Sequence, residues 1–178
     1  LYVMSGSGKD SFVRSYTVAD GVQVDSLAGV FNQSNFVLHP SEERFYISTH
    51  FKAEQIGIDA GQMTRRWEAP DTADPDPFDR LFAADDLLIS RQGHILTSSA
   101  TQENDLQYAG TLEGGGYADI VFDTYNDVIL GLGNEKLDAY RASDRVLIHT
   151  EAITRIGIHL GAYADELYIC LLYTSDAA

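Results

Sequence analysis

The chain has 178 residues, of which 27 are acidic and 12 basic, and its formal net charge is −15. A surface this negative repels phosphate backbones and anionic membrane faces, so nucleic acid is excluded as an expected partner. No apolar run reaches the roughly eighteen residues that a membrane-spanning helix needs, so no insertion into a membrane is predicted.

The N-terminal third of the chain predicts short strands separated by turns. Residues 1–6, 13–18 and 22–28 are rich in β-branched, aromatic and aliphatic side chains, which suit a pleated and half-buried surface. Strand-like segments follow in the same order at residues 36–48, 55–58 and 62–69.

One apolar triplet marks the repeat. Its third residue is Val3, Ile47, Ile89, Leu130 and Ile169, so successive copies are 44, 42, 41 and 39 residues apart. Periods near 40 residues are typical of propeller blades, and also of HEAT and armadillo repeats, which need two or three amphipathic helices in each unit. Only residues 81–89 show a stripe of helical spacing, so an all-β repeat is predicted.

Residues 117–153 form the most regular copy. The strand-like segments there are 119–123, 128–132, 136–140 and 145–152. The Asn, Asp and Gly residues between them are turn residues. In the third segment Asp138 and Tyr140 share one face, as the period of a strand requires. This stretch predicts four antiparallel strands, which make one propeller blade.

These patterns together predict the fold class: an all-β chain that forms a β-propeller fragment of about four blades, as an open arc of a larger propeller. Each blade is expected to be a four-stranded antiparallel sheet. The expected blades are residues 1–35, 36–77, 78–115 and 116–154, with the start of a fifth at 155–169. The first blade lacks its opening strand, so we expect the rest of the propeller to lie outside this sequence.

The segment 170–178 reads CLLYTSDAA and resembles the translated product of a sequencing-library adapter. We expect it to be a non-native tail that interrupts a longer gene, as in metagenomic fragments, and it takes no part in the predicted fold. It holds the only cysteine, Cys170, so disulfides, thiolate nucleophiles and cysteine-based zinc sites are excluded for the rest of the chain.

Two sequence lines resemble known propeller repeats. Residues 36–48, FVLHPSEERFYIS, resemble the blade motif of YVTN-type and lactonase-like propellers. Residues 58–67, IDAGQMTRRW, and 137–147, LDAYRASDRVL, are similar to the blade motif of quinoprotein-like propellers. The resemblance implies a periplasmic or extracellular location and, for the quinoprotein kind, a pyrroloquinoline quinone cofactor. Trp67 is the only tryptophan, so the set of docking tryptophans expected of a quinoprotein is absent.

Three residues are candidates for catalysis, namely His39, Asp123 and His159. His39 and His159 fall at matching positions of the repeat, each at the end of a first strand, and Asp123 is a looser alignment. A repeat also explains such matching without any role in catalysis. No His-X-His or His-Glu-X-X-His spacing is present, so no histidine metal site is predicted.

Two irregular loops depart from the repeat and are candidates for ligand binding. Their acidic residues are Asp71, Asp74, Asp76 and Asp79 in the first loop, and Glu103 and Asp105 in the second. Carboxylate oxygens are ligands for calcium, but two prolines stiffen the first loop and the glycine of a tight calcium loop is missing. No metal site is predicted, and the four aspartates of the first loop are the candidates if calcium binds.

Two functions from different classes remain. The first is a non-catalytic scaffold that binds a protein or other ligand through its loops and face, and the acidic loops favour a cationic partner. The alternative is a propeller enzyme of the lactonase or quinoprotein dehydrogenase type. We favour the scaffold, because an enzyme needs several chemical groups to converge from different blades, and fold alone does not supply them. No cofactor is predicted, with calcium and pyrroloquinoline quinone as the alternatives.

Overall fold

The structure is a computed structural model of the whole chain. It describes residues 1–5, 11–29, 35–48, 52–69, 80–84, 86–123, 125–153, 157–163 and 166–171. From residue 157 onward it describes the backbone and, among the side chains, that of Leu160. No helix that could span a bilayer occurs in this described part of the chain.

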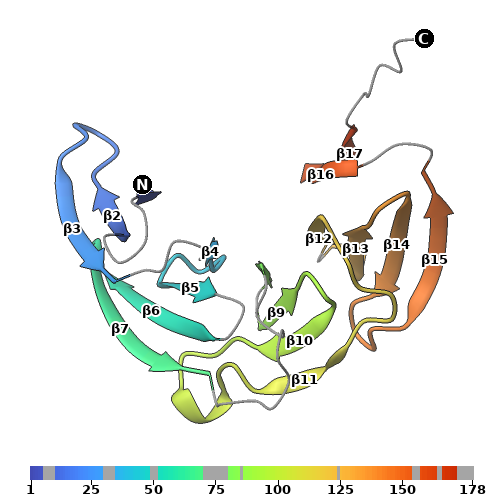
Figure 1. Cartoon of the computed structure of the whole chain (residues 1–178), viewed down its shortest axis with the longest axis horizontal. Coiled ribbons are helices and arrows are strands. Elements are labelled where there is room, and N and C mark those ends of the chain that lie inside the picture. Colours follow the sequence, from blue (N-terminus) through green and yellow to red (C-terminus); the bar gives the residue numbers. More distant parts are fainter. Residues whose placement is uncertain are drawn as a thin grey trace. The chain divides into compact units, whose positions relative to one another are not determined.

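The strands form five sheets in chain order (Figure 1). The first sheet has three strands: β1 (Tyr2–Ser5), β2 (Phe12–Tyr16) and β3 (Gln23–Ala28). The second sheet has four: β4 (Asn35–Leu38), β5 (Arg44–Ser48), β6 (Ala53–Asp59) and β7 (Gln62–Glu68). In each sheet, strands that are consecutive in the sequence are neighbours in the sheet, so every sheet is a simple meander.

The remaining sheets continue this order. The third contains β8 (Leu81–Ala84), β9 (Leu87–Ser90), β10 (His94–Thr97) and β11 (Tyr108–Thr111), with a short 3-10 helix, η2 (Gln102–Asn104), before its last strand. The fourth contains β12 (Asp119–Asp123), β13 (Val128–Leu132), β14 (Lys136–Arg141) and β15 (Leu147–Ala152). The fifth pairs β16 (Gly157–Tyr163) with β17 (Glu166–Leu171).

The predicted repeat is confirmed at its second strands. The apolar triplets lie in β5, β9, β13 and β17, each the second strand of its sheet, and the N-terminal triplet overlaps β1 at the start of the three-stranded sheet. Residues 81–89, which show helical spacing in the sequence, form the strands β8 and β9 instead. Strand β17 continues through Cys170 into the segment that resembles an adapter product.

The chain divides into two compact units. The first consists of Leu1–Ser90 and Leu96–Tyr108, and the second of Arg91–Ile95 and Ala109–Ala178. The division passes through the third sheet.

Strand β5 forms the centre of the first unit, because both of its faces are buried. Phe45 and Ile47 point to one side, where they pack with Val13 of the first sheet and Ile56 and Met63 of the second. Tyr46 points to the other side, into a cluster with Ala53, Leu81, Leu88, Leu96 and Leu106. The alternation along β5 therefore joins three consecutive sheets, as expected for a strand between two apolar layers.

A β-bulge recurs in the outer strand pair. The register shifts at Ser15/Tyr16 in the first sheet, at Gln55/Ile56 in the second and at Ala139/Tyr140 in the fourth. The extra residue lies in the last strand each time, where a bulge twists an exposed edge and discourages pairing with another chain.

Candidate functional site

His39 follows β4 and is buried, with 4% of its surface exposed. Its Nδ1 lies 2.9 Å from the Ser41 hydroxyl, and its Nε2 accepts a hydrogen bond from Arg44 at 2.9 Å. Arg44 is itself buried and also donates to the Ser98 hydroxyl at 3.4 Å. Both ring nitrogens of His39 therefore have partners within the protein.

The expectation that His39 and His159 occupy matching positions is wrong. His39 lies just beyond the last residue of β4, beside the turn into β5. His159 lies near the start of β16 and pairs with Cys170, so the two occupy opposite ends of their first strands. The sequence comparison overlooked this because β16 extends to Tyr163, four residues past the histidine.

Asp123 and the backbone of His159 lie at opposite ends of β12. Asp123 is the last residue of β12 and pairs with Val128. The backbone N–H of Leu160, next to His159, donates to the Asp119 carboxylate at the other end of β12. At about 3.3 Å per residue, the backbones of these two ends of the strand are about 13 Å apart.

The two acidic loops differ in what the structure describes. The candidates Asp71, Asp74, Asp76 and Asp79 lie outside the described residues. Glu103 lies in η2 and is exposed. Asp105 differs from the prediction of a ligand-binding residue, because only 1% of its surface is exposed and its carboxylate is fully engaged inside the protein.

The Asp105 carboxylate is the centre of a polar network in the first unit. One oxygen accepts from the Tyr46 hydroxyl at 2.8 Å and from the Ser99 backbone N–H at 2.7 Å. The other accepts from Gln55 and from the Trp67 indole, each at 2.7 Å. These four donors replace the water that the carboxylate loses on burial. Burying it therefore costs much less free energy than burying an unpaired carboxylate.

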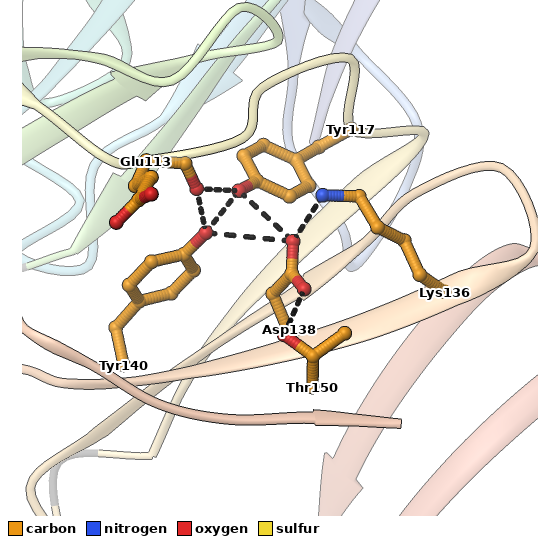
Figure 2. A network of polar contacts seen from close by, with 6 residues as sticks. All are labelled: Glu113, Tyr117, Lys136, Asp138, Tyr140 and Thr150. Atoms are coloured by element: carbon orange, nitrogen blue, oxygen red, sulfur yellow. Dashed lines mark hydrogen bonds and ion pairs between the residues drawn. The ribbon is translucent and has the colours of Figure 1, made fainter. Parts of the chain in front are cut away.

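A second network lies in the second unit, around β14 (Figure 2). The Tyr117 and Tyr140 hydroxyls hydrogen-bond to each other, and the backbone carbonyl of Glu113 accepts a hydrogen bond from this pair of hydroxyls. Asp138 lies beside them and is buried; it accepts from Lys136 at 2.5 Å and from Thr150 at 2.9 Å. Figure 2 shows these groups converging from β14, β15 and the segment before β12.

Close packing against glycine holds this second network in place. A Cβ atom at Gly114 would lie 2.8 Å from Lys136 Nζ and 3.0 Å from the Tyr117 hydroxyl, and Gly114 has a φ of +116°. A Cβ at Gly131 would lie 2.6 Å from the Tyr117 ring. The backbone approaches these side chains so closely that only glycine fits at either position.

The surroundings of both networks favour the protonated forms of their phenols and of Lys136. Burial raises the pKa of Tyr46 to about 12, and the Asp105 charge adds to this. Burial also raises the pKa of Tyr117 and of Tyr140. The hydrogen bond to Asp138 raises the pKa of Lys136, which stays charged.

These directions are opposite to those that suit a catalytic base or nucleophile. A tyrosine or lysine that acts as a base or nucleophile needs a lowered pKa, so that it can lose its proton near neutral pH. The three phenols and Lys136 instead keep their protons and act as hydrogen-bond donors. In the part of the chain that the structure describes, no cluster of three or more His, Cys, Asp or Glu is arranged to hold a metal ion.

Sequence reasoning missed both networks. The available signals were the shared face of Asp138 and Tyr140 and the run of glycines at residues 114–116, which marks a close backbone approach. Nothing in the sequence indicates that Asp105 folds back onto the second sheet, because its partners come from three strands that are 38 to 59 residues away.

Comparison with known proteins gives the fold. No protein-family model and no curated protein sequence matches the chain. Solved structures do match, among them "Dihydro-heme d1 dehydrogenase NirN in complex with DHE", a β-propeller protein, with a TM-score of 0.66 and 10% identity. The match covers 88% of this chain and 36% of that one, so the chain spans about a third of its length. Together with the repeated four-stranded meanders, this likeness shows that the chain has the fold of β-propeller blades.

Proposed function

We propose that the chain is a non-catalytic β-propeller scaffold that binds a cationic partner through exposed acidic turns. One observation carries the proposal: in the first unit, exposed carboxylates gather in the turns at one end of the sheets, and these turns contain no Lys or Arg. The phenols and Lys136 of the two networks have raised pKa values and serve as hydrogen-bond donors within the protein, so recognition is assigned to the exposed groups at the ends of the sheets.

In a meander, the turns after the first and third strands lie at one end of the sheet. In the four-stranded sheets of the first unit, these turns carry the exposed acids Glu42, Glu43, Asp86 and Glu103, and the exposed Asp59 ends β6 just before such a turn. In the three-stranded sheet, the turn after β2 carries the exposed Asp20. Residues 17–22, 39–43, 59–61, 86 and 98–107, which make up these turns, contain no Lys or Arg. We call this set of exposed acids the acidic end.

Contacts between sheets align these turns within the first unit. The Ser15 hydroxyl, near the end of β2, donates to the Gly61 carbonyl in the turn after β6 at 2.7 Å. Arg44, just after the turn from β4, donates to Ser98 at the end of β10. The acids therefore share one side of the unit, and their combined field favours a positively charged partner.

Hydrogen bonds keep one of these carboxylates ionised. The Thr17 hydroxyl and the Val22 backbone N–H both donate to Asp20 and lower its pKa. Exposed charges of this kind act within about 8–10 Å at physiological ionic strength, so they supply attraction and orientation more than tight binding. The proposal needs no cofactor.

The assignment to a particular propeller family is also part of this proposal. The motif lines at residues 36–48 and 58–67 support a place among YVTN-type, lactonase-like or quinoprotein-like propellers, with a periplasmic or extracellular location. The solved neighbour is a dehydrogenase with a bound ligand, but at 10% identity the likeness carries the fold and not that activity.

The test is binding of octalysine, a simple cationic probe, to the full chain by calorimetry at low and at physiological salt. We expect measurable binding at low salt that weakens as salt rises, and a loss of affinity in the Glu42→Gln/Glu43→Gln variant. The matched control is Glu68→Gln, an exposed acid at the opposite end of the second sheet. Equal losses in both variants, or no binding at low salt, would overturn the proposal.

A further inference from the structure

The loop that carries Glu103 has an ordered shape of its own. We call residues 99–105 the η2 loop; Gln102, Glu103 and Asn104 form its 3-10 turn and are exposed. The Asn104 and Asp105 backbone N–H groups donate to the carbonyls of Thr101 and Gln102. The Thr97 hydroxyl donates to the Asn104 carbonyl at 2.5 Å.

The last residue of the loop leaves its own sheet and is bound by the second one. Asp105 receives the Tyr46, Gln55 and Trp67 donors from β5, β6 and β7, and the Ser99 N–H from the start of the loop. The same carboxylate thus closes the loop on itself and fixes it to three neighbouring strands. Gln55 strengthens this attachment, because it also donates to the Ser99 carbonyl at 2.8 Å.

Leu106, the residue after the loop, holds the chain where it reverses direction. Leu106 has a φ of +54°, a region that bulky side chains rarely adopt, and is 2% exposed within the cluster around Tyr46 and Leu88. Burial of its side chain offsets the cost of this backbone conformation. The hydrogen bonds of Asp105 and the buried side chain of Leu106 therefore both hold the exposed turn in place.

We propose that Asp105 is the positioning residue of a preorganised contact loop, which presents Glu103 to a cationic partner. This rests on the proposed function, and it names the η2 loop as part of the contact surface and Asp105 as the residue that sets its shape. A loop that is already ordered loses little conformational entropy on binding, so its affinity is higher than that of a free loop of the same charge. Trp67, the only tryptophan, reports on this attachment through its bond to Asp105.

The first measurement is hydrogen exchange of the loop amides in Asp105→Asn. Asparagine has nearly the same shape as aspartate, but an NH₂ group replaces one carboxylate oxygen. An NH₂ group cannot accept hydrogen bonds, so the donors on that side of the side chain lose their acceptor. We expect the amides of residues 101–104 to exchange at least about tenfold faster, while those of β14 are unchanged. The matched control is Asp25→Asn, which removes another carboxylate that accepts across the sheets, from the Met63 N–H, without touching the loop.

Unchanged exchange in the loop, or an equal rise in β14, would overturn the positioning role. Because Asp105→Asn could lower overall stability, Trp67→Phe provides a milder second variant that removes a single donor and keeps the carboxylate. We expect it to speed exchange at the same amides by a smaller factor. A rise confined to other segments in Trp67→Phe would also count against the inference.

The second measurement is a double-mutant cycle for octalysine affinity. Glu103→Gln removes one exposed charge and is expected to weaken binding by about twofold to threefold. Asp105→Asn is expected to weaken it in the wild type but to add nothing in the Glu103→Gln background, because it acts through the position of Glu103. Additive losses would show that Asp105 does not act through Glu103.

The two proposals fail in different ways. If octalysine does not bind the wild type, the proposed function fails, and the exchange measurement still decides whether Asp105 holds the loop. If octalysine binds and Glu42→Gln/Glu43→Gln weakens it, but the cycle is additive, the function stands and the positioning role falls.

Discussion

Tyr46 shows at the scale of one residue how burial controls protonation. Its pKa is raised to about 12, from an ordinary value of 10.0. The folded state binds this proton more tightly than the unfolded state, so the stabilisation is complete below pH 10 and is lost as pH rises toward about 12. We expect the free energy of unfolding of Tyr46→Phe to fall less steeply over this pH range than that of the wild type. Urea titration at several pH values measures both. A wild-type stability that stays constant across that window would contradict the assignment.

Lys136 and Lys52 offer a matched pair of ion pairs. The two lysine side chains are about equally exposed, but Lys136 contacts the buried Asp138, whereas Lys52 contacts the exposed Glu68. Lys136→Met leaves a buried carboxylate without its cation and is expected to lower the free energy of unfolding by about 2 kcal/mol. Lys52→Met is expected to cost less than about 1 kcal/mol. Similar losses in thermal or urea unfolding would show that the Asp138 network does not depend on its lysine.

At the scale of elements, Gly131 tests how β13 packs against the segment before β12. An added Cβ would lie 2.6 Å from the Tyr117 ring, while the backbone of Gly131 itself is ordinary. Gly131→Ala is therefore expected to cost about 2 kcal/mol through overpacking. The control is Gly21→Ala, where φ is +69° but no atom lies within 4 Å, so only the backbone cost of about 1 kcal/mol applies. Chemical denaturation measures both, and a Gly131→Ala loss no larger than that of Gly21→Ala would contradict the packing.

The strands were predictable because they depend on local pattern. Alternation and turn residues locate β12 and β13 at their observed bounds, and the triplet spacing places the second strand of each sheet. The bulges in the outer strands were not predictable, since a bulge depends on pairing with a neighbour. The helical spacing of residues 81–89 was misleading, because two short strands separated by a turn imitate it.

The candidate site was predictable only in part. The exposed position of Glu103 follows from the polar, irregular sequence around it. The burial of Asp105, two residues on, does not, because it depends on donors from Tyr46, Gln55 and Trp67. The same holds for Lys136 and Tyr117, whose positions are set by Gly114 and Gly131. Hydrogen-bond partners that lie far apart in the sequence leave no periodic pattern, so periodicity cannot predict them.

At the scale of the whole molecule, an apolar groove predicts self-association. It has a volume of about 410 Å³, lies beside β1 and is lined by Leu1, Val3, Tyr16, Thr17, Val18 and Gly21. Leu1 and Val18 are 66% and 86% exposed, and β1 is the end strand of its sheet, so both apolar surface and a strand edge face outward.

Val3→Lys places a charge at this edge and is expected to reduce association, measured by sedimentation velocity over a range of protein concentrations. Tyr125→Lys, at a side chain that is 87% exposed in the second unit, is the control and should leave association unchanged. A wild-type chain that stays monomeric at high concentration would contradict the prediction.

The central proposal is that this chain binds a partner and does not catalyse a reaction. The most direct test is turnover by the full chain with lactones and with alcohols plus pyrroloquinoline quinone, compared in the wild type, in His39→Ala and in a variant with residues 101–105 replaced. The account predicts that no substrate gives a saturable rate above that of the unfolded chain, and that octalysine binding is weakened by the loop replacement. A saturable rate that disappears in His39→Ala and survives the loop replacement would contradict it.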